Sequence, residues 1–419
     1  MSIILKSAKV INAESKYNGT KQDILISEGK IQKISKSISS PKSKEINIKN
    51  LQVSSGWFDS SVSFGEPGFE ERETILNGGN VAARSGFTNI LLNSNTNPVI
   101  DNQSDVSFIK IKSKDLITKI HPIGALTISS KSKDLAELMD MKNSGAVAFY
   151  DFKKPIINPN LLKTSLLYSQ TFDTIIMSFG QEDSVSNNGV MNEGLVSTTY
   201  GIKGIPNLSE EIQISRDLKI LEYTGGKLHI PTISTKESVD LIKKAKSNGL
   251  NVTCSVAIHN LIFNEEKLKE FDTRYKVSPP LRTDKDRIAL INAVKKGIID
   301  MVTSDHIPID VDNKKTDIDS AKNGTVGLES FFGALLTIFS LDESIRILTS
   351  GKQRFGINNH SIQEGSNADL TLFTSNSNNN YTFSKSNILS KSKNSAFLGM
   401  KMSGTSLGVI VGKKYIINE

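Results

Sequence analysis

Short apolar runs alternate with amphipathic segments through the middle of this 419-residue chain. The apolar runs have the length of buried strands, and several intervening segments repeat apolar residues with the period of a helix. Strand, helix and strand repeated many times predict a parallel sheet covered by helices. About eight such units over about 300 residues fit a (β/α)8 barrel better than an open sheet. The strand-like runs are residues 87–93, 121–127, 146–151, 173–179, 226–234, 251–258 and 298–305, and helical patterns cover 132–145, 236–249 and 284–297.

Both ends of the chain carry strand patterns instead. Residues 2–11, 23–35 and 43–56 alternate apolar and polar side chains, and residues 369–374 and 406–419 look similar. Alternation with period two is typical of a half-buried strand. We therefore predict an α/β protein with two domains. A small β-sandwich is expected from residues 1–53 and 356–419, and the (β/α)8 TIM barrel from residues 54–355.

The composition and the N-terminal sequence bear on where in the cell the protein is located. No apolar run reaches the roughly 18 residues of a membrane span, so no membrane association is expected. The N-terminal sequence lacks the basic head, apolar core and cleavage site of a secretion signal. The single cysteine, Cys254, excludes an internal disulfide and is expected to be buried. These features predict a cytoplasmic protein.

The formal net charge of +7 and the sequence pI of about 9.1 raise the question of a nucleic-acid partner. The lysines lie among Ser and Asn, as in SKSISSPKSKE (35–45) and FSKSNILSKSKNS (383–395), without interleaved aromatic residues for base stacking. This pattern favours a solvated lysine-rich surface. We expect no nucleic-acid partner.

Several residues with reactive or metal-binding side chains follow the strand-like runs. The carboxyl ends of barrel strands form the face on which ligands bind, so these residues are expected to meet there. They are Asp59, Asn95, Asp151, Thr232, His259 and Asp305.

Long motifs of the chain resemble the bacterial dihydroorotases of the amidohydrolase superfamily. The resemblance runs over nearly the whole length. It includes GEPGFEERET (65–74), GFTNILLNSNTNPVIDN (86–102), GIPNLSEEIQISRDLKILEYTGGKLHI (204–230), VSPPLRT (277–283), IDMVTSDHIP (299–308) and GTVGLES (324–330). It implies a barrel with a β-sandwich built from both termini. It also implies opening or closing of the dihydroorotate ring, with zinc lowering the pKa of a bound water and an aspartate after the eighth strand shuttling the proton.

The metal ligands that this resemblance implies are replaced in the chain. The family pattern Asp-x-His-x-His after the first strand reads Asp59-Ser60-Ser61-Val62-Ser63. Serine is a far poorer zinc ligand than imidazole. Phe152 stands where a bridging acid is implied. One further histidine position holds Ser178 or the adjacent Phe179, and another holds Thr232. Asp305 is retained as a vestige of the catalytic set. A catalytic zinc needs about three suitable protein ligands, so we expect no metal cofactor.

Residues implied to contact the substrate survive only in part. Asn95, His259 and Gly324 are retained, whereas Gly65 stands where an arginine and Ile309 where a histidine is expected. Each retained residue also has a purely structural interpretation. Asp305 could bond nearby backbone amides, His259 could be a hydrogen-bonded core residue, and Asn95 could shape a turn. Arg282 could bind an anion or form a surface salt bridge. Phe64, Phe152 and Phe179 suggest partial collapse of the pocket.

Two functions remain open at this point. The first is a pseudoenzyme with a structural or regulatory role, forming a homo-oligomer and assembling with aspartate carbamoyltransferase, a partner that the family resemblance implies. The second is an active dihydroorotase or other cyclic amidohydrolase that interconverts dihydroorotate and N-carbamoyl-L-aspartate. The replaced ligand set favours the first.

Overall fold

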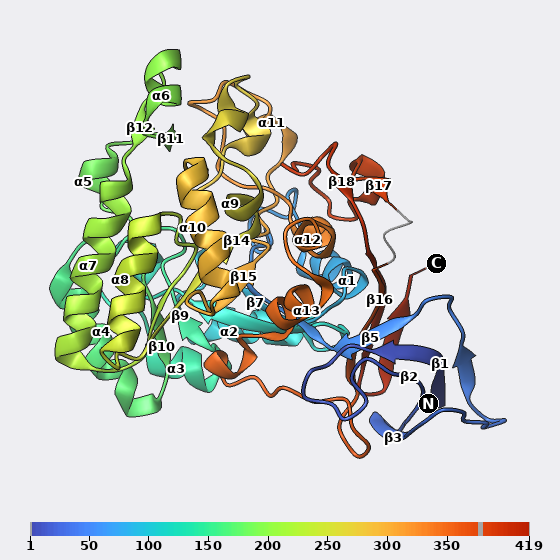
Figure 1. Cartoon of the computed structure of the whole chain (residues 1–419). Helices are drawn as coiled ribbons and strands as arrows, with labels where there is room; N and C mark the ends of the chain where they lie inside the picture. Colours follow the sequence, from blue (N-terminus) through green and yellow to red (C-terminus); the bar gives the residue numbers. More distant parts are fainter. Residues whose placement is uncertain (1, 376–379, 419) are drawn as a thin grey trace.

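The computed structural model describes residues 2–375 and 380–418 and contains the expected barrel (Figure 1). Eight parallel strands follow one another around it in chain order. Val62, the last residue of the first strand, forms a parallel bridge with His306, which lies just beyond the last strand, so the barrel is nearly closed. The (β/α)8 prediction is confirmed. The strands are β6 (Trp57–Val62), β7 (Phe87–Leu92), β8 (Lys119–Gly124), β9 (Ala148–Phe149), β10 (Ile175–Met177), β13 (Leu228–Ile230), β14 (Val252–Ala257) and β15 (Met301–Thr303).

Helices cover the outside of the barrel, and several begin where the sequence offers a cap. The threonine hydroxyls of Thr74, Thr235 and Thr283 each accept a hydrogen bond from a backbone amide in the first turn of their helix. Of the helical patterns, 236–249 and 284–297 form long helices, whereas only Leu138–Asn143 of 132–145 is helical. The helices are α1 (Ile75–Arg84), α2 (Gln103–Ser113), α3 (Leu138–Asn143), α4 (Pro159–Ser169), α7 (Asn207–Thr224), α8 (Lys236–Ser247), α10 (Asp284–Lys295), α12 (Leu328–Leu335) and α13 (Leu341–Thr349).

Shorter elements surround one end of the barrel. In Figure 1 the segment with β11, β12 and α6 extends beyond the body of the barrel, next to the region of α11. All of these elements except β17 and β18 follow barrel strands in the chain, as loops at the ligand-binding face of a barrel do. They are α5 (Asp183–Ser186), β11 (Met191–Asn192), α6 (Leu195–Tyr200), β12 (Gly204–Ile205), α9 (Ile258–Ile262) and α11 (Val311–Lys314), with β17 (Tyr381–Thr382) and β18 (Lys401–Met402) forming a separate small sheet.

A second eight-stranded sheet combines the two ends of the chain. Strands from the N-terminus pair with strands from the C-terminus where β5 lies antiparallel to β16. Ile3, Ile24, Val53, Leu370 and Ile410 belong to a core that is separate from the barrel core. The strands are β1 (Ser2–Val10), β2 (Lys21–Ser27), β3 (Lys30–Ser35), β4 (Lys44–Ile46), β5 (Gln52–Ser55), β16 (Asp369–Thr374), β19 (Thr405–Val411) and β20 (Lys414–Ile417).

No helix in residues 2–375 and 380–418 is both long and apolar enough to cross a membrane. Cys254 is fully buried in β14, as expected for a small apolar side chain.

A buried ion pair joins the barrel to the second sheet. The Lys352 ammonium, in a short 3-10 helix (Lys352–Phe355), donates to the Gly56 carbonyl at 2.7 Å and to Asp369 Oδ2 at 3.2 Å. Gly56 links β5 to β6, and Asp369 begins β16. Burial alone would raise the pKa of Asp369, but the adjacent Lys352 charge helps to hold it below its usual value. The pair therefore fixes the point at which the chain passes between the two sheets.

We expect the change Lys352→Met to lower the free energy of unfolding by about 3–5 kcal/mol, because it leaves Asp369 buried without its counter-charge. Urea denaturation followed by circular dichroism measures the loss. The double change Lys352→Met with Asp369→Leu removes both charges and should recover part of it. A single variant as stable as the unchanged protein would contradict the assigned role.

Candidate active site

The centre of the barrel mouth is an ion pair between Asp305 and Lys153. Asp305 follows β15, and its Oδ2 lies 2.6 Å from Nζ of Lys153, which follows β9. Asp305 is buried and Lys153 largely so, with 1% and 11% of their side-chain surface exposed. Lys153 also donates to the backbone carbonyl of Ser278. Asp305 thus has a cationic partner instead of the backbone amides expected from the sequence, and that expectation was wrong.

A network of neutral groups holds the other side of the Asp305 carboxylate. The Ser61 hydroxyl donates to Asp305 Oδ1 at 3.2 Å. The Asn93 side-chain amide donates to the hydroxyls of both Ser61 and Ser63, each at 3.2 Å. All four side chains are buried. The two serines at the implied histidine positions are therefore bound into an amide–hydroxyl network.

Asp59 joins the first barrel strand to the last. Its Oδ1 accepts hydrogen bonds from the Thr303 hydroxyl and the Ser61 amide, and its Oδ2 accepts one from the Ser304 amide at 3.1 Å. Burial raises the pKa of Asp59 to about 6. These bonds run between β6 and the end of β15, so Asp59 helps to close the barrel.

The remaining implied ligand positions lie in separate environments. Ser178 donates to Asp217 of α7 at 2.6 Å. The Phe152 ring lies edge-on to the Tyr150 ring, with centroids 5.7 Å apart. The Thr232 hydroxyl is buried and has no hydrogen-bond partner among the described residues. The residues thus share no common ion-binding point.

Zinc does not fit the side chains at this centre. In the described ranges 2–375 and 380–418, no three His, Cys, Asp or Glu side chains gather as a metal site. The groups around Asp305 are hydroxyls, an amide, an ammonium and one imidazole, that of His259 at 3.9 Å, which is too few ligands for zinc, and the Lys153 ammonium would repel a cation.

Lys153 was missed by the sequence interpretation. Two sequence signals were present: it follows a barrel strand, and it lies next to Phe152 at an implied ligand position. Its backbone φ of +53° is uncommon for a residue with a side chain. This conformation is a property that the sequence alone did not indicate.

His259 lies beside the ion pair without bonding to it. Its Nε2 is 3.9 Å from Asp305 Oδ2, and neither ring nitrogen has a hydrogen-bond partner among the described residues. Burial lowers the pKa of His259 to about 4, so the ring is neutral near pH 7. The expectation of a core histidine was right about burial and wrong about hydrogen bonding.

The other retained residues line or support the mouth. Asn95 borders a cavity of about 440 Å³, and its Oδ1 is buried without a partner in the described part of the chain. Gly324 has a φ of +146°, and a Cβ there would come within 2.8 Å of the Ile307 side chain. Gly324 is therefore required by packing, irrespective of any substrate.

The three phenylalanines do not act together to fill the mouth. Phe179 is buried in the barrel core with Tyr150, and Phe152 packs against the edge of that core. Phe64 packs towards α1, where a Cβ on Gly78 would come within 2.3 Å of its ring. A cavity remains, bordered by Phe64 and Phe152 and by Arg72, Lys153, Lys154 and Lys322.

Arg282 forms neither a surface salt bridge nor a contact with the mouth cavity. Its guanidinium is buried and donates to the Ile205 carbonyl at 2.6 Å, Asn192 Oδ1 at 2.9 Å and the Ser234 hydroxyl at 3.0 Å. The alternative of a surface salt bridge was wrong, because the segments that carry these three acceptors cover the arginine. Arg282 fastens these loops together.

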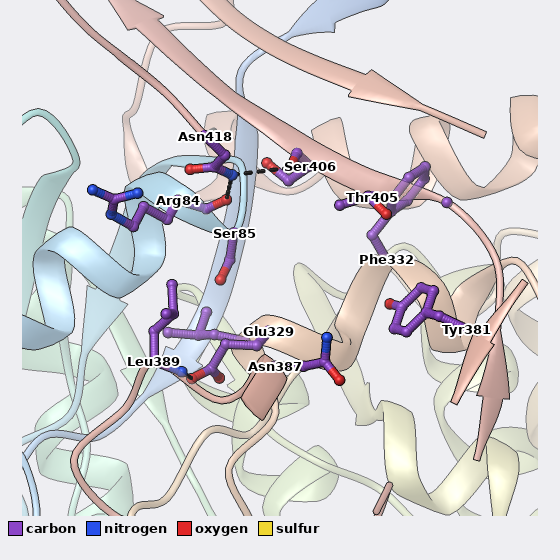
Figure 2. Close-up of a pocket in the computed structure, with 13 residues that line it drawn as sticks. Arg84, Ser85, Glu329, Phe332, Tyr381, Asn387, Leu389, Thr405, Ser406 and Asn418 are labelled. Atoms are coloured by element: carbon purple, nitrogen blue, oxygen red, sulfur yellow. Dashed lines mark hydrogen bonds between the residues drawn. The ribbon is translucent and has the colours of Figure 1, made fainter. Parts of the chain in front are cut away.

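A smaller pocket of about 180 Å³ lies between α12 and the C-terminal strands (Figure 2). Its buried carboxylate, Glu329, accepts hydrogen bonds from the Ser390 amide and hydroxyl and from the Leu389 amide. The Asn418 side chain donates to the carbonyls of Arg84 and Ser406 (Figure 2). These polar groups anchor chain segments, so the pocket is not the candidate active site.

Comparison with known proteins agrees with the sequence motifs. A family model described as "Dihydro-orotase-like" matches residues 52–238. The chain is 36% identical to a dihydroorotase of Acetivibrio thermocellus over 100% of this chain and 99% of that one. It is 37% identical to a dihydroorotase of Caldicellulosiruptor saccharolyticus over 99% and 98% of the two chains.

Solved structures support the fold. An L-hydantoinase from Arthrobacter aurescens superposes with a TM-score of 0.85 at 22% identity, over 99% of this chain and 96% of that one. A dihydropyrimidinase from Brevibacillus agri superposes with a TM-score of 0.83 at 19% identity, over 100% and 95%. At these identities the likeness concerns the fold alone.

The buried histidines predict a specific dependence of stability on pH. His229 is bonded to the hydroxyls of Thr253 and Ser255, and burial lowers its pKa to about 3. Below pH 6.5 the unfolded chain binds a proton at His229 that the folded chain does not bind. Falling pH therefore favours the unfolded chain and lowers the free energy of unfolding. Relative to the unchanged protein, His229→Gln should gain up to about 1.4 kcal/mol per pH unit below 6.5.

Urea denaturation of both proteins between pH 7.5 and pH 5 measures this difference. The same replacement at the partly exposed His360 is the control. A stability difference between His229→Gln and the unchanged protein that stays constant over this range would disprove the assignment.

Proposed function

Because the chain belongs to the dihydroorotase family, we propose that it is a non-catalytic member whose barrel serves assembly or regulation instead of ring opening. The proposal rests on one observation, the ion pair between Lys153 and Asp305. In the chemistry implied by the resemblance, a metal supplies hydroxide and an aspartate moves the proton. Here the retained aspartate is bound to a lysine at the position where that chemistry would take place.

The geometry around the pair also opposes proton transfer by Asp305. A general base must be free to accept a proton from the reacting group at hydrogen-bond distance. One oxygen of Asp305 accepts from Ser61, and the other accepts from Lys153. A proton from a substrate would have to compete with these two donors for the carboxylate.

A role in assembly needs an exposed surface, and apolar side chains are exposed at the periphery of the barrel. Leu195 of α6 is 82% exposed, and Tyr223 of α7 is 81% exposed. Single exposed apolar residues are common in monomers, so they support but do not locate an interface. We propose a homo-oligomer that binds aspartate carbamoyltransferase, with the net charge of +7 favouring an acidic partner surface.

We expect the purified protein to contain far less than stoichiometric zinc and to show no dihydroorotase turnover above background in either direction. The double change Ser61→His with Ser63→His should not restore turnover, because Lys153 still binds Asp305 and Phe152 and Thr232 still replace other ligands. Elemental analysis and assays with dihydroorotate and carbamoyl aspartate measure both outcomes.

A chelator provides the control for metal. A bound ion stabilises the folded state by mass action, so a chelator should leave the melting temperature unchanged if no ion is bound. Stoichiometric zinc, a lowered melting temperature with chelator, or turnover in the double variant would each refute the non-catalytic assignment.

The partner is tested by co-expression with the aspartate carbamoyltransferase of the same organism. A stable interface of this kind buries about 1,600 Å² in total, and we expect a complex in size-exclusion chromatography with mass measurement. The complex should weaken as salt rises if the net charge steers the encounter. Separate elution at micromolar concentration, with unchanged transferase kinetics on mixing, would exclude this partner.

A further inference from the structure

A cationic crevice lies next to the barrel mouth, and no role assigned above uses it. Its volume is about 720 Å³, within the range of small-molecule sites. Its walls come from the 3-10 helix Thr273–Tyr275, the segment around α11, and residues 385–398. We propose that this crevice binds a small polyphosphate-bearing anion of nucleotide size.

Positive charge in the crevice exceeds its local compensation. Six cationic side chains line it against three carboxylates. Each carboxylate already has an arginine partner. Asp272 is bonded to Arg274. Asp310 and Glu71 lie 3.4 Å and 3.6 Å from Nε of Arg72, an arginine that does not line the crevice. Within residues 2–375 and 380–418, none of the five lining lysines forms an ion pair; they are Lys314, Lys315, Lys385, Lys391 and Lys393.

Three of these lysines are held in place by backbone carbonyls. Lys391 Nζ donates to the Glu70 carbonyl at 2.7 Å, and Lys393 Nζ donates to the Ile388 carbonyl at 2.5 Å. Lys314 Nζ donates to the carbonyls of Lys276 and Lys322 at 2.8 and 2.9 Å. An ammonium has three donors, so each retains at least one for a ligand. Fixed positions reduce the entropy lost when an anion binds.

Buried carboxylates fasten the lysine-rich segment to the barrel. Glu73 accepts a hydrogen bond from the Lys391 amide at 2.9 Å, and Glu329 accepts one from the Ser390 amide at 2.8 Å. The Ser392 hydroxyl donates to the Arg72 carbonyl at 2.9 Å. The sequence FSKSNILSKSKNS, interpreted above as a solvated surface, is therefore an anchored wall of the crevice.

The crevice has a wall of lysine ammonium groups and a wall of apolar side chains, and these two walls indicate the shape of the ligand. Lysine ammonium groups act as point charges and bind phosphate oxygens without the planar geometry that arginine requires. Ile309 and Leu398 add apolar lining, as does Val311, which is 66% exposed. A ligand with several phosphate charges and one flat apolar group would contact both walls. Burial also lowers the pKa of Lys314 to about 7, and an adjacent anion would favour its charged form.

Calorimetry at low salt tests the site with two probes, inorganic tripolyphosphate and ATP, each without divalent metal. We expect saturable binding of one anion per chain that weakens as sodium chloride is added. The double change Lys315→Glu with Lys385→Glu should weaken binding at least about tenfold, because each change replaces an attraction with a repulsion. Both side chains are exposed, so the fold should be retained.

The control is the double change Lys49→Glu with Lys133→Glu, which alters the net charge equally at exposed positions outside the crevice. Affinity within about twofold of the unchanged protein is expected for this control. No saturable binding of either probe, or equal weakening in both double variants, would overturn the proposal.

Tighter binding of ATP than of tripolyphosphate, removed by Val311→Asp, would show that the apolar wall contacts the base. Equal binding of the two probes would identify the ligand as a polyphosphate alone. Neither result depends on zinc content or on the proposed partner.

Discussion

The ion pair between Lys153 and Asp305 determines which groups the barrel mouth can hold. The buried Asp305 carboxylate at the end of the last barrel strand has a positive partner, and a lysine from the chain itself supplies it. An external cation at Asp305 would have to displace this ammonium and gather its other ligands from hydroxyls, an amide and the single imidazole of His259. The neighbouring Ser61 and Asn93 then complete the hydrogen bonds beside this pair.

The barrel itself is held by further interactions outside the ion pair. Asp59 bridges the first and last strands, and Lys352 links the barrel to the second sheet through Asp369. His229 is satisfied by hydroxyls within the barrel. Such interactions can preserve a large fold while the residues at its mouth change. The cationic crevice beside the mouth depends on a different segment, which Glu73 and Glu329 anchor through the amides of Lys391 and Ser390.

The fold was predictable from the sequence because its strongest signals are local. The regular apolar spacing of residues 236–249 predicted a helix, and the structure has α8 there, with Thr235 as its N-terminal cap. The site was less predictable, because its bonds join residues far apart in the chain. Lys153 and Asp305 are separated by 152 positions, and no periodicity relates them. The same limit applies to Arg282, whose buried partners come from three other segments, and to the lysines of residues 383–395, whose crevice exists only after folding.

The pairing of β5 with β16 has a consequence for the order in which the protein can be made. During synthesis the strands at the N-terminus leave the ribosome first, but the partner of β5 lies more than 300 residues later in the chain. Until then the β5 edge has open backbone groups that could pair with other chains. The nascent chain must therefore keep these strands protected until the last strands emerge. The lysine-rich, sparsely apolar segment 35–45 within this region provides charge that opposes such association.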